Sequence, residues 1–313
     1  MKNATGESFA KIILLGEHAV VYGQPAIALP VKSIRLTASL TAGTDQSIHS
    51  SFYAGSLQAA ANTDFAGIAD LIAALLKHFN AVDAGFTLTI KSALPPERGM
   101  GSSAACATAV VRAFYAAFEQ PLSRAQLLAW TATSEHAIHG NPSGLDAATT
   151  SADRPQWFVK GQAPVPIQFP KNGTLVIADT GIAGQTKIAV GAVAKHLADD
   201  PDKTTASIEA IGQATVFAAK ALAEDDLLAL GAQMDHAQLA LQALGVSNAA
   251  LDQLIQTAKA HGALGAKLTG SGQGGCMIAL ANNARDAQTI RQALTQAGAT
   301  ATWQYDFSEE RTH

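Results

Sequence analysis

The sequence predicts a two-domain protein that mixes helices and strands, and three observations support this fold class. The chain has 313 residues, which is enough for two domains of ordinary size. Strand-like and helix-like stretches follow one another through the first half of the chain. Beyond Asp153 the character changes, because residues 154–173 contain four prolines and only short polar pieces. We therefore expect one domain over residues 1–160 and a second over residues 161–313.

Composition excludes several classes of protein. Hydrophobic residues make up 48% of the chain and charged residues 15%, so a substantial core is expected. The formal net charge of −4 gives no indication of nucleic-acid binding. No apolar run approaches the roughly 18 residues of a membrane span, and Glu17 and His18 interrupt any signal-peptide pattern. We expect a soluble cytoplasmic protein whose two cysteines, Cys106 and Cys276, are buried free thiols.

The first half of the chain reads as strands covered by helices. Apolar or alternating stretches predict strands over residues 8–15, 26–31, 33–41 and 86–91. Helical spacing predicts helices over residues 65–79, 102–118 and 123–139. The last of these helices begins at Ser123 with Gln126 three residues on, a capping-box pattern, and ends at Gly140. Residues 45–62 fit no clear pattern, and we interpret them as a loop that covers a site.

The second half predicts a small sheet with several helices. Strands are expected over residues 174–179, 266–269, 276–280 and 301–307. Helices are expected over residues 205–222, 225–244, 247–261 and 284–297. The two middle strands are joined by the glycine-rich sequence TGSGQGG, which we interpret as a hairpin whose backbone supports a ligand or another loop.

The stretch LPPERGMGSSAACATAVVRAFYAAF, residues 94–118, combines a glycine-rich loop with the start of an apolar helix. Gly99 and Gly101 let the backbone adopt positive φ and let a ligand approach closely. The first turn of a helix carries unpaired N–H groups and the positive end of the helix dipole, which together favour phosphate. Ser102 and Ser103 add hydroxyls that could cap the helix or reach a metal ion. The alternative is a capped core helix that follows a tight turn.

A second motif, KIILLGEHAVVYG, begins at Lys11. An ionised lysine in an apolar strand needs a partner. We expect Lys11 and His18 to face a site at the end of this strand. The alternative is a lysine at the edge of a strand followed by a solvated turn.

The third motif, SEHAIHGNPSGLD, contains Glu135 and Asp146 on either side of a turn. We expect Asn141 and Pro142 to force this turn, and Ser143 to cap a short helix with Asp146 in its first turn. Two carboxylates that converge there suit Mg²⁺ binding together with a general base. A zinc site is disfavoured, because the sequence has no HExxH motif and no cysteine nearby. Asp146 as a simple helix-start charge is the remaining alternative.

Dinucleotide binding is also disfavoured. The glycines of TGSGQGG formally match GxGxxG, but a strand follows them rather than a helix. Gly99, Gly101 and Ala104 form a similar pattern that does begin a helix. However, another helix follows that one, so the βαβ unit of a dinucleotide-binding fold is missing.

Three of these stretches, in this order and spacing, resemble the motifs of the GHMP small-molecule kinases, and they span residues 8–280. The resemblance implies an α+β two-domain GHMP-kinase fold, with an N-terminal α/β domain that has a mixed sheet and a ferredoxin-like α+β C-terminal domain. Within the family, GEHAVVYG and HGNPSGLD are typical of members that act on mevalonate. The resemblance therefore implies ATP-dependent phosphorylation of mevalonate to 5-phosphomevalonate, a reaction of isoprenoid precursor synthesis, with Mg²⁺ as cofactor. The alternatives are a kinase for another small alcohol, such as phosphomevalonate, or a nucleotide-binding regulator without catalysis.

The resemblance also implies roles for individual residues. Asp146 would take the proton of the substrate hydroxyl, and Lys11 beside it would stabilise negative charge. Glu135 and Ser103 would hold Mg²⁺, and Glu17, His18, Ser143 and Thr180 would contact substrate together with Asp146. The nucleotide would be bound by Pro96, Glu97, Arg98, Gly99, Met100, Gly101, Ser102, Ser103 and Ala104.

Two features of the sequence depart from the family pattern or stay open. The usual opening A-P-G-K is Ser8, Phe9, Ala10 and Lys11 here, so the backbone before the lysine is expected to differ. Arg98 stands just before the phosphate loop, where it could contact a phosphate or only solvent. A homodimer is a common state for soluble enzymes and is a further expectation.

Overall fold

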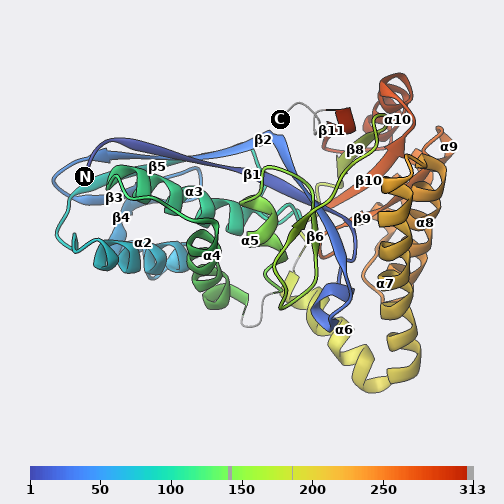
Figure 1. The fold of residues 1–313 in the computed structure, drawn as a ribbon, viewed down its shortest axis with the longest axis horizontal. Coiled ribbons are helices and arrows are strands. Elements are labelled where there is room, and N and C mark those ends of the chain that lie inside the picture. Colours follow the sequence, from blue (N-terminus) through green and yellow to red (C-terminus); the bar gives the residue numbers. More distant parts are fainter. Residues whose placement is uncertain (140–142, 185, 309–313) are drawn as a thin grey trace. The chain divides into compact units, whose positions relative to one another are not determined.

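A computed structural model describes residues 1–139, 143–184 and 186–308, apart from the side chains of residues 134–139 (Figure 1). The chain forms two compact units, and each is built from several segments. The first unit contains residues 1–11, 30–95 and 101–152, and the second contains residues 12–29, 96–100 and 153–313. Within the described part of the chain, no helix is both long and apolar enough to cross a membrane.

The first unit is a mixed sheet covered by helices. Strand β5 lies at its centre, antiparallel to β2 and parallel to β3, so the mixed character expected for this domain is confirmed. Phe114 of the covering helix α3 packs edge-to-face on Phe86 of β5. The strands are β1 (Ala4–Leu15), β2 (Ala26–Ala42), β3 (Gln46–His49), β4 (Ala54–Ser56) and β5 (Phe86–Ser92), and β1 and β2 continue into the second unit. The helices are α1 (Leu57–Ala60), α2 (Ala66–His78), α3 (Ser102–Ala117), α4 (Arg124–His139) and α5 (Leu145–Thr150).

Two expectations for the first unit were wrong. The strands expected over residues 26–31 and 33–41 are one strand, because half-buried Lys32 continues β2 instead of ending it. Residues 45–62 are mostly regular structure and not a loop. There β3 adds to the edge of β5, and Ser56 caps α1 by accepting a hydrogen bond from the Ala59 N–H.

The ends of α4 and α5 show which capping expectations hold. The capping box of α4 is confirmed, since the Ser123 N–H donates to the Gln126 side chain and the Gln126 N–H donates to the Ser123 hydroxyl. Asp146 lies in the first turn of α5, as expected. However, the cap of α5 is Gly144 in a left-handed conformation, and the Ser143 hydroxyl accepts from the Leu145 N–H instead. The turn expected at Asn141 and Pro142 lies outside the described residues.

The second unit contains a four-stranded antiparallel sheet in the order β11-β8-β10-β9. Numbered along the chain, this order is 4-1-3-2, and helices follow the first and third of these strands. The arrangement is that of a ferredoxin-like domain, which confirms the expectation. The strands of the unit are β6 (Gln156–Phe158), β7 (Val165–Pro166), β8 (Thr174–Asp179), β9 (Gly265–Thr269), β10 (Cys276–Ala281) and β11 (Ala301–Asp306). The helices are η1 (Ala19–Tyr22), α6 (Thr186–Asp199), α7 (Pro201–Ala223), α8 (Leu227–Ala243), α9 (Ala249–Ala260) and α10 (Ala284–Gln296).

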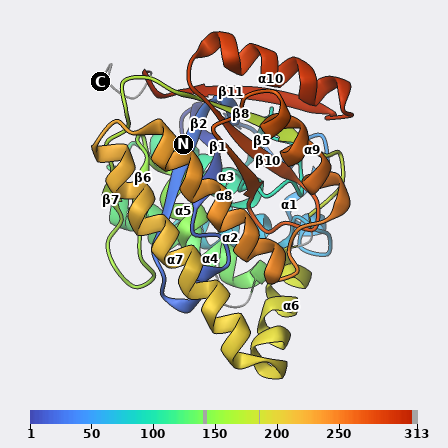
Figure 2. The same ribbon diagram turned by 90° about the vertical axis from the view of Figure 1, so that its right-hand side faces the viewer.

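The core of the second unit forms between its sheet and its helices. Val176 of β8 and Met277 of β10 belong to one buried cluster with Leu241 of α8, Leu254 of α9 and Ile290 of α10. Helices α7 and α8 lie side by side along most of their length (Figure 2). Both helices were predicted from the sequence, whereas α6 was missed.

Gly6 of β1 tests how closely the first unit is packed. A β-carbon added there would lie 2.1 Å from the carbonyl oxygen of Ala109 in α3, whereas one added at Gly191 in α6 would meet no atom within 4 Å. We expect Gly6→Ala to lower the free energy of unfolding by about 1–3 kcal/mol or more. Gly191→Ala should raise it by about 0.5–1 kcal/mol, because alanine is the better helix former. Urea unfolding of both variants measures this, and equal responses would contradict the packing described.

Candidate active site

An ion pair between Lys11 and Asp146 lies at the centre of the candidate site in the first unit. The Lys11 Nζ lies 2.9 Å from Oδ1 of Asp146. The lysine side chain is 3% exposed, while that of Asp146 is 40% exposed. A buried ammonium group requires a close partner, and the aspartate meets this need while one side of its carboxylate stays open to a ligand. The structure thus brings together the two residues expected to act on the substrate hydroxyl.

Helix α5, which carries Asp146, is fastened to its neighbours by buried polar contacts. The hydroxyl of Ser8 in β1 donates to the carbonyl oxygen of Thr150 at 3.0 Å. Arg112 of α3 donates to the carbonyl oxygen of Ser151 at 3.0 Å. Ser8 belongs to the segment that departs from the family opening. Its hydroxyl therefore supplies a tie between the strand of Lys11 and the helix of Asp146.

The start of α3 lies directly against Lys11. Its N-cap is Gly101, which has φ 74° and makes no side-chain capping bond. A β-carbon at Gly101 would lie 2.8 Å from Cγ of Lys11, so only glycine lets the loop pass this closely. Ser102 and Ser103 are half-buried in the first turn and do not serve as the cap. The first N–H groups of α3 and the positive end of its dipole form a surface suited to an anion.

The two residues expected to bind a metal lie on helices that pack against each other. Ser103 lies in the first turn of α3, and Glu135 belongs to α4, which packs on α3. The Glu135 side chain is outside the described residues, as are those of His136 and His139. Elsewhere in the described chain, no three His, Cys, Asp or Glu side chains are grouped as a metal site would require. A hydroxyl and a carboxylate are oxygen donors of the kind that Mg²⁺ takes alongside phosphates and water.

The second unit contains a further group of the expected residues, while Ser143 and Ala104 belong to the first. Pro96, Glu97, Arg98, Gly99 and Met100 form the segment that precedes Gly101, and Met100 is buried. The sequence left open whether Arg98 contacts a phosphate or only solvent. Its guanidinium instead pairs with the carboxylate of Asp179 at the end of β8. The Thr180 hydroxyl donates to the Gly275 carbonyl oxygen at 2.8 Å.

The glycine-rich hairpin between β9 and β10 packs against another loop, residues 96–100. Support of another loop was one of the two roles expected for this hairpin. A β-carbon at Gly270 would lie 2.7 Å from Cα of Gly99, and one at Gly275 would lie 2.8 Å from the carbonyl oxygen of Arg98. Both glycines also have positive φ. Side chains at these positions would separate the hairpin from residues 96–100.

His18 is buried with a defined tautomer. Its Nε2 lies 2.9 Å from the carbonyl oxygen of Ser271. A carbonyl oxygen only accepts, so Nε2 carries the proton and Nδ1 is left as an acceptor. Burial lowers the pKa of His18, the hydrogen bond to Ser271 partly opposes this effect, and the charge of Lys267 lowers the pKa further. The backbone at His18 has φ 59°, a left-handed conformation that is uncommon for a residue other than glycine.

Glu17, which precedes His18 in the sequence, forms a buried ion pair with Lys267. Neither side chain is exposed, and the lysine also donates to the carbonyl oxygen of Leu268 at 2.6 Å. Two residues further along β9, the Thr269 hydroxyl bridges the N–H and the carbonyl oxygen of Ile13. Sequence analysis assigned no role to Lys267. The available signal was a lysine inside an otherwise apolar strand.

The two cysteines are buried free thiols, as expected. Burial raises the pKa of the Cys106 thiol to about 12. Burial, together with the neighbouring carboxylate of Asp179, also raises the pKa of Cys276. Neither thiol is therefore a nucleophile at neutral pH.

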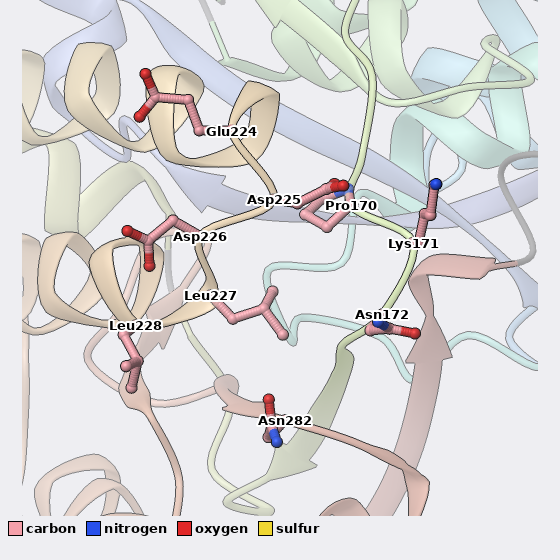
Figure 3. A pocket seen from close by; sticks show the side chains of 9 residues that line it. All are labelled: Pro170, Lys171, Asn172, Glu224, Asp225, Asp226, Leu227, Leu228 and Asn282. Atoms are coloured by element: carbon pink, nitrogen blue, oxygen red, sulfur yellow. The ribbon is translucent and has the colours of Figure 1, made fainter.

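One pocket of the second unit lies apart from the expected residues (Figure 3). Its volume is 520 Å³, and it contains none of the residues expected to bind nucleotide or substrate. It is lined by Pro170, Lys171, Asn172, Glu224, Asp225, Asp226, Leu227, Leu228 and Asn282.

Comparison with known proteins defines the class of protein. The family described as GHMP kinases N terminal domain matches residues 66–153, and GHMP kinases C terminal matches residues 218–300. The chain belongs to the GHMP kinase family. It is 31% identical to the mevalonate kinase of Pyrococcus furiosus, over 93% of this chain and 92% of that protein.

Solved structures give the same result. The L. major mevalonate kinase in complex with R-mevalonate is 25% identical, with a TM-score of 0.82 over 96% of this chain and 95% of that one. The mevalonate kinase from methicillin-resistant Staphylococcus aureus MRSA252 is 29% identical, with a TM-score of 0.75 over 98% of this chain and 100% of that one.

The buried histidine predicts a pH dependence of stability. Unfolded His18 titrates near its ordinary pKa of 6.5, whereas the folded protein holds it below that value. As the pH falls below 6.5, the unfolded chain therefore binds a proton that the folded protein does not, and the free energy of unfolding decreases. Asparagine tolerates the left-handed backbone, so His18→Asn should remove this part of the dependence. Urea unfolding between about pH 5 and pH 8 measures it. A His18→Asn protein with an unchanged pH profile would contradict the assignment.

Proposed function

We propose that this protein transfers the γ-phosphoryl group of ATP to the 5-hydroxyl of mevalonate, which gives 5-phosphomevalonate and ADP. The observation that carries the proposal is the Lys11–Asp146 pair, 2.9 Å apart and directly beside Gly101 at the start of α3. The relatedness to mevalonate kinases over nearly the whole chain supports mevalonate as the alcohol.

In this proposal Asp146 acts as the general base. Its carboxylate accepts the proton of the substrate hydroxyl as that oxygen attacks the γ-phosphorus. The Lys11 ammonium, 2.9 Å from that carboxylate, stabilises the negative charge that develops on the attacking oxygen. Phosphoryl transfer depends on positioning and on charge stabilisation more than on covalent catalysis. A buried lysine fixed in one place suits that requirement.

The nucleotide is proposed to bind along residues 96–104. The N–H groups that begin α3, together with the hydroxyl of Ser102, would hold the phosphates. Ser103 and Glu135 would hold Mg²⁺ between the β- and γ-phosphates, where the ion would neutralise charge. Glu17, His18, Ser143 and Thr180 would contact mevalonate. We propose domain limits of 1–160 and 161–313 for the working enzyme.

A panel of alcohols tests the substrate. ADP release in a coupled assay is followed with mevalonate, phosphomevalonate, galactose and homoserine, each in the presence of ATP and Mg²⁺. We expect turnover of mevalonate to exceed that of the others by far. Preference for phosphomevalonate or galactose would assign the chain to another branch of the family, and a complete lack of turnover would overturn the proposal.

Asp146→Asn tests the base. The amide keeps the size of the side chain but cannot take a proton, so kcat should fall by about 10²–10⁴-fold. ATP affinity, measured by titration calorimetry, should change little. Asp235→Asn is a matched control, because Asp235 is also a partly exposed carboxylate paired with a lysine, and its kcat should stay close to that of the wild type. A kcat for Asp146→Asn near the wild-type value would refute the role of base.

Ser103→Ala tests the metal site. The loss of one oxygen ligand should raise the Mg²⁺ concentration for half-maximal rate by about tenfold, equivalent to about 1.4 kcal/mol. Ser102→Ala removes the neighbouring hydroxyl and should weaken ATP binding without this change in metal requirement. If both variants showed the wild-type Mg²⁺ dependence, Ser103 would not be a ligand.

A further inference from the structure

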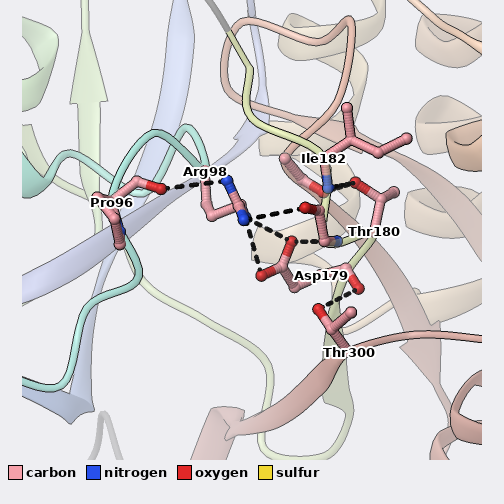
Figure 4. Close-up of polar contacts among 8 residues, drawn as sticks. Pro96, Arg98, Asp179, Thr180, Ile182 and Thr300 are labelled. Atoms are coloured by element: carbon pink, nitrogen blue, oxygen red, sulfur yellow. Dashed lines mark hydrogen bonds and ion pairs between the residues drawn. The ribbon is translucent and has the colours of Figure 1, made fainter.

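Arg98 is held by three partners, all within the second unit (Figure 4). Its Nε donates to the carboxylate of Asp179 at 3.0 Å, and its Nη2 donates to the Gly181 carbonyl oxygen at 3.0 Å. Its Nη1 donates at 3.3 Å to the carbonyl oxygen of Pro96, in its own loop. The side chain of Arg98 is 18% exposed and that of Asp179 is 6% exposed. The guanidinium is therefore committed to protein groups.

Asp179 is itself a fixed anchor. It is the last residue of β8, which is paired on both sides, with β10 and with β11. Its carboxylate accepts from the Gly181 N–H at 2.8 Å, and its carbonyl oxygen accepts from the Thr300 N–H at 2.9 Å. Arg98 thus ties the segment 96–100 to an internal strand of the four-stranded sheet.

Backbone contacts extend this attachment along the loop. The Glu97 carbonyl oxygen accepts from the Gly184 N–H at 2.8 Å. Gly99 packs against Gly270, and Gly275 lies against the carbonyl of Arg98. Every residue from Glu97 to Gly99 therefore has a backbone partner in the second unit. The next residues, Met100 and Gly101, lead directly into the first turn of α3.

We propose that Arg98 and Asp179 form a positioning pair, which fixes the backbone of residues 97–100 and so the amides that this segment offers to the nucleotide phosphates, while neither side chain contacts the nucleotide. The proposal rests on the proposed function only for the identity of the ligand. If Arg98 turned to a phosphate, it would leave the buried carboxylate of Asp179 without its charged partner, which is strongly unfavourable. The structure thus assigns the charge of Arg98 to the protein, while its backbone remains part of the loop.

Three variants of the full-length protein test the pair. Arg98→Gln and Asp179→Asn each remove one charge, and the double variant removes both. We expect each single variant to weaken ATP and ADP binding by about tenfold, measured by calorimetric titration at a temperature where every variant is folded. The double variant should be weakened by about tenfold and not a hundredfold, because both changes break the same contact. The KM for ATP should rise in all three, and the KM for mevalonate should change little.

Two other results would overturn the proposal. If Arg98 binds phosphate directly, Arg98→Gln will weaken ATP binding while Asp179→Asn leaves it intact or strengthens it. If the pair serves stability alone, the melting temperature will fall while nucleotide affinity is unchanged. The paired control Lys259→Gln with Asp235→Asn removes another ion pair of the same unit. It shows how nucleotide affinity responds to a loss of stability alone.

Arg98→Lys keeps the test decisive if Arg98→Gln does not fold. Lysine retains the charge but lacks the planar fork that reaches Asp179 and Gly181 together. We expect the nucleotide affinity of Arg98→Lys to lie between that of the wild type and that of Asp179→Asn. A wild-type affinity in Arg98→Lys would count against a geometric role for the arginine. Because nucleotide affinity is measured without an alcohol, these results stand apart from the substrate panel. A wild-type protein that binds ATP but does not phosphorylate mevalonate would overturn the proposed reaction and not the role of Arg98.

Discussion

The constraint on which the first unit depends is the burial of the Lys11 amine. An ammonium group with so little exposure requires a carboxylate at contact distance, and Asp146 supplies it at 2.9 Å. This requirement determines what surrounds the pair. Helix α5 must be held against β1, which the Ser8 hydroxyl does, and the loop before α3 must pass over the lysine, which only glycine at position 101 allows. The partly exposed carboxylate of Asp146 and the start of α3 therefore both lie against Lys11 for reasons of packing.

The second unit uses polar contacts from β9 and the turn after it to hold the end of β1 and the residues that follow. The side chains of Lys267 and Thr269 in β9 contact Glu17 and Ile13, and the carbonyl oxygen of Ser271, beyond the strand, contacts His18. Two of the three motifs, those that begin at Lys11 and at Leu94, are divided between the units, because the chain passes from one unit to the other after Lys11 and again after Met100. The third motif, SEHAIHGNPSGLD, belongs to the first unit alone.

Much of the fold could be predicted, because its signals are local. The glycine-to-helix transition after Gly101, the buried strand β8 and the hairpin of β9 and β10 all have strong periodicity or clear breakers. Helix α6 was missed because it buries only Ala189 and Val193 of its fourteen residues and carries Gly191 in its middle, where glycine disfavours a helix. The pairing of Lys11 with Asp146 depends on contacts far apart in sequence, and only the family resemblance suggested it. The tie between Lys267 and Glu17 had no such guide.

The charge balance of the phosphate loop leads to a conclusion about how ATP is held. Lys11 and Arg98 are the cations that the sequence places at or next to the loop, and each is paired with an aspartate, Asp146 and Asp179. Neither pair carries net charge toward a ligand. In the proposed site, attraction for a triphosphate then comes from the amides and dipole at the start of α3, and from a metal ion bound to the nucleotide. If ATP binds as proposed, we expect this site to favour a metal–nucleotide complex over a free nucleotide, because both of these cations are already paired with carboxylates.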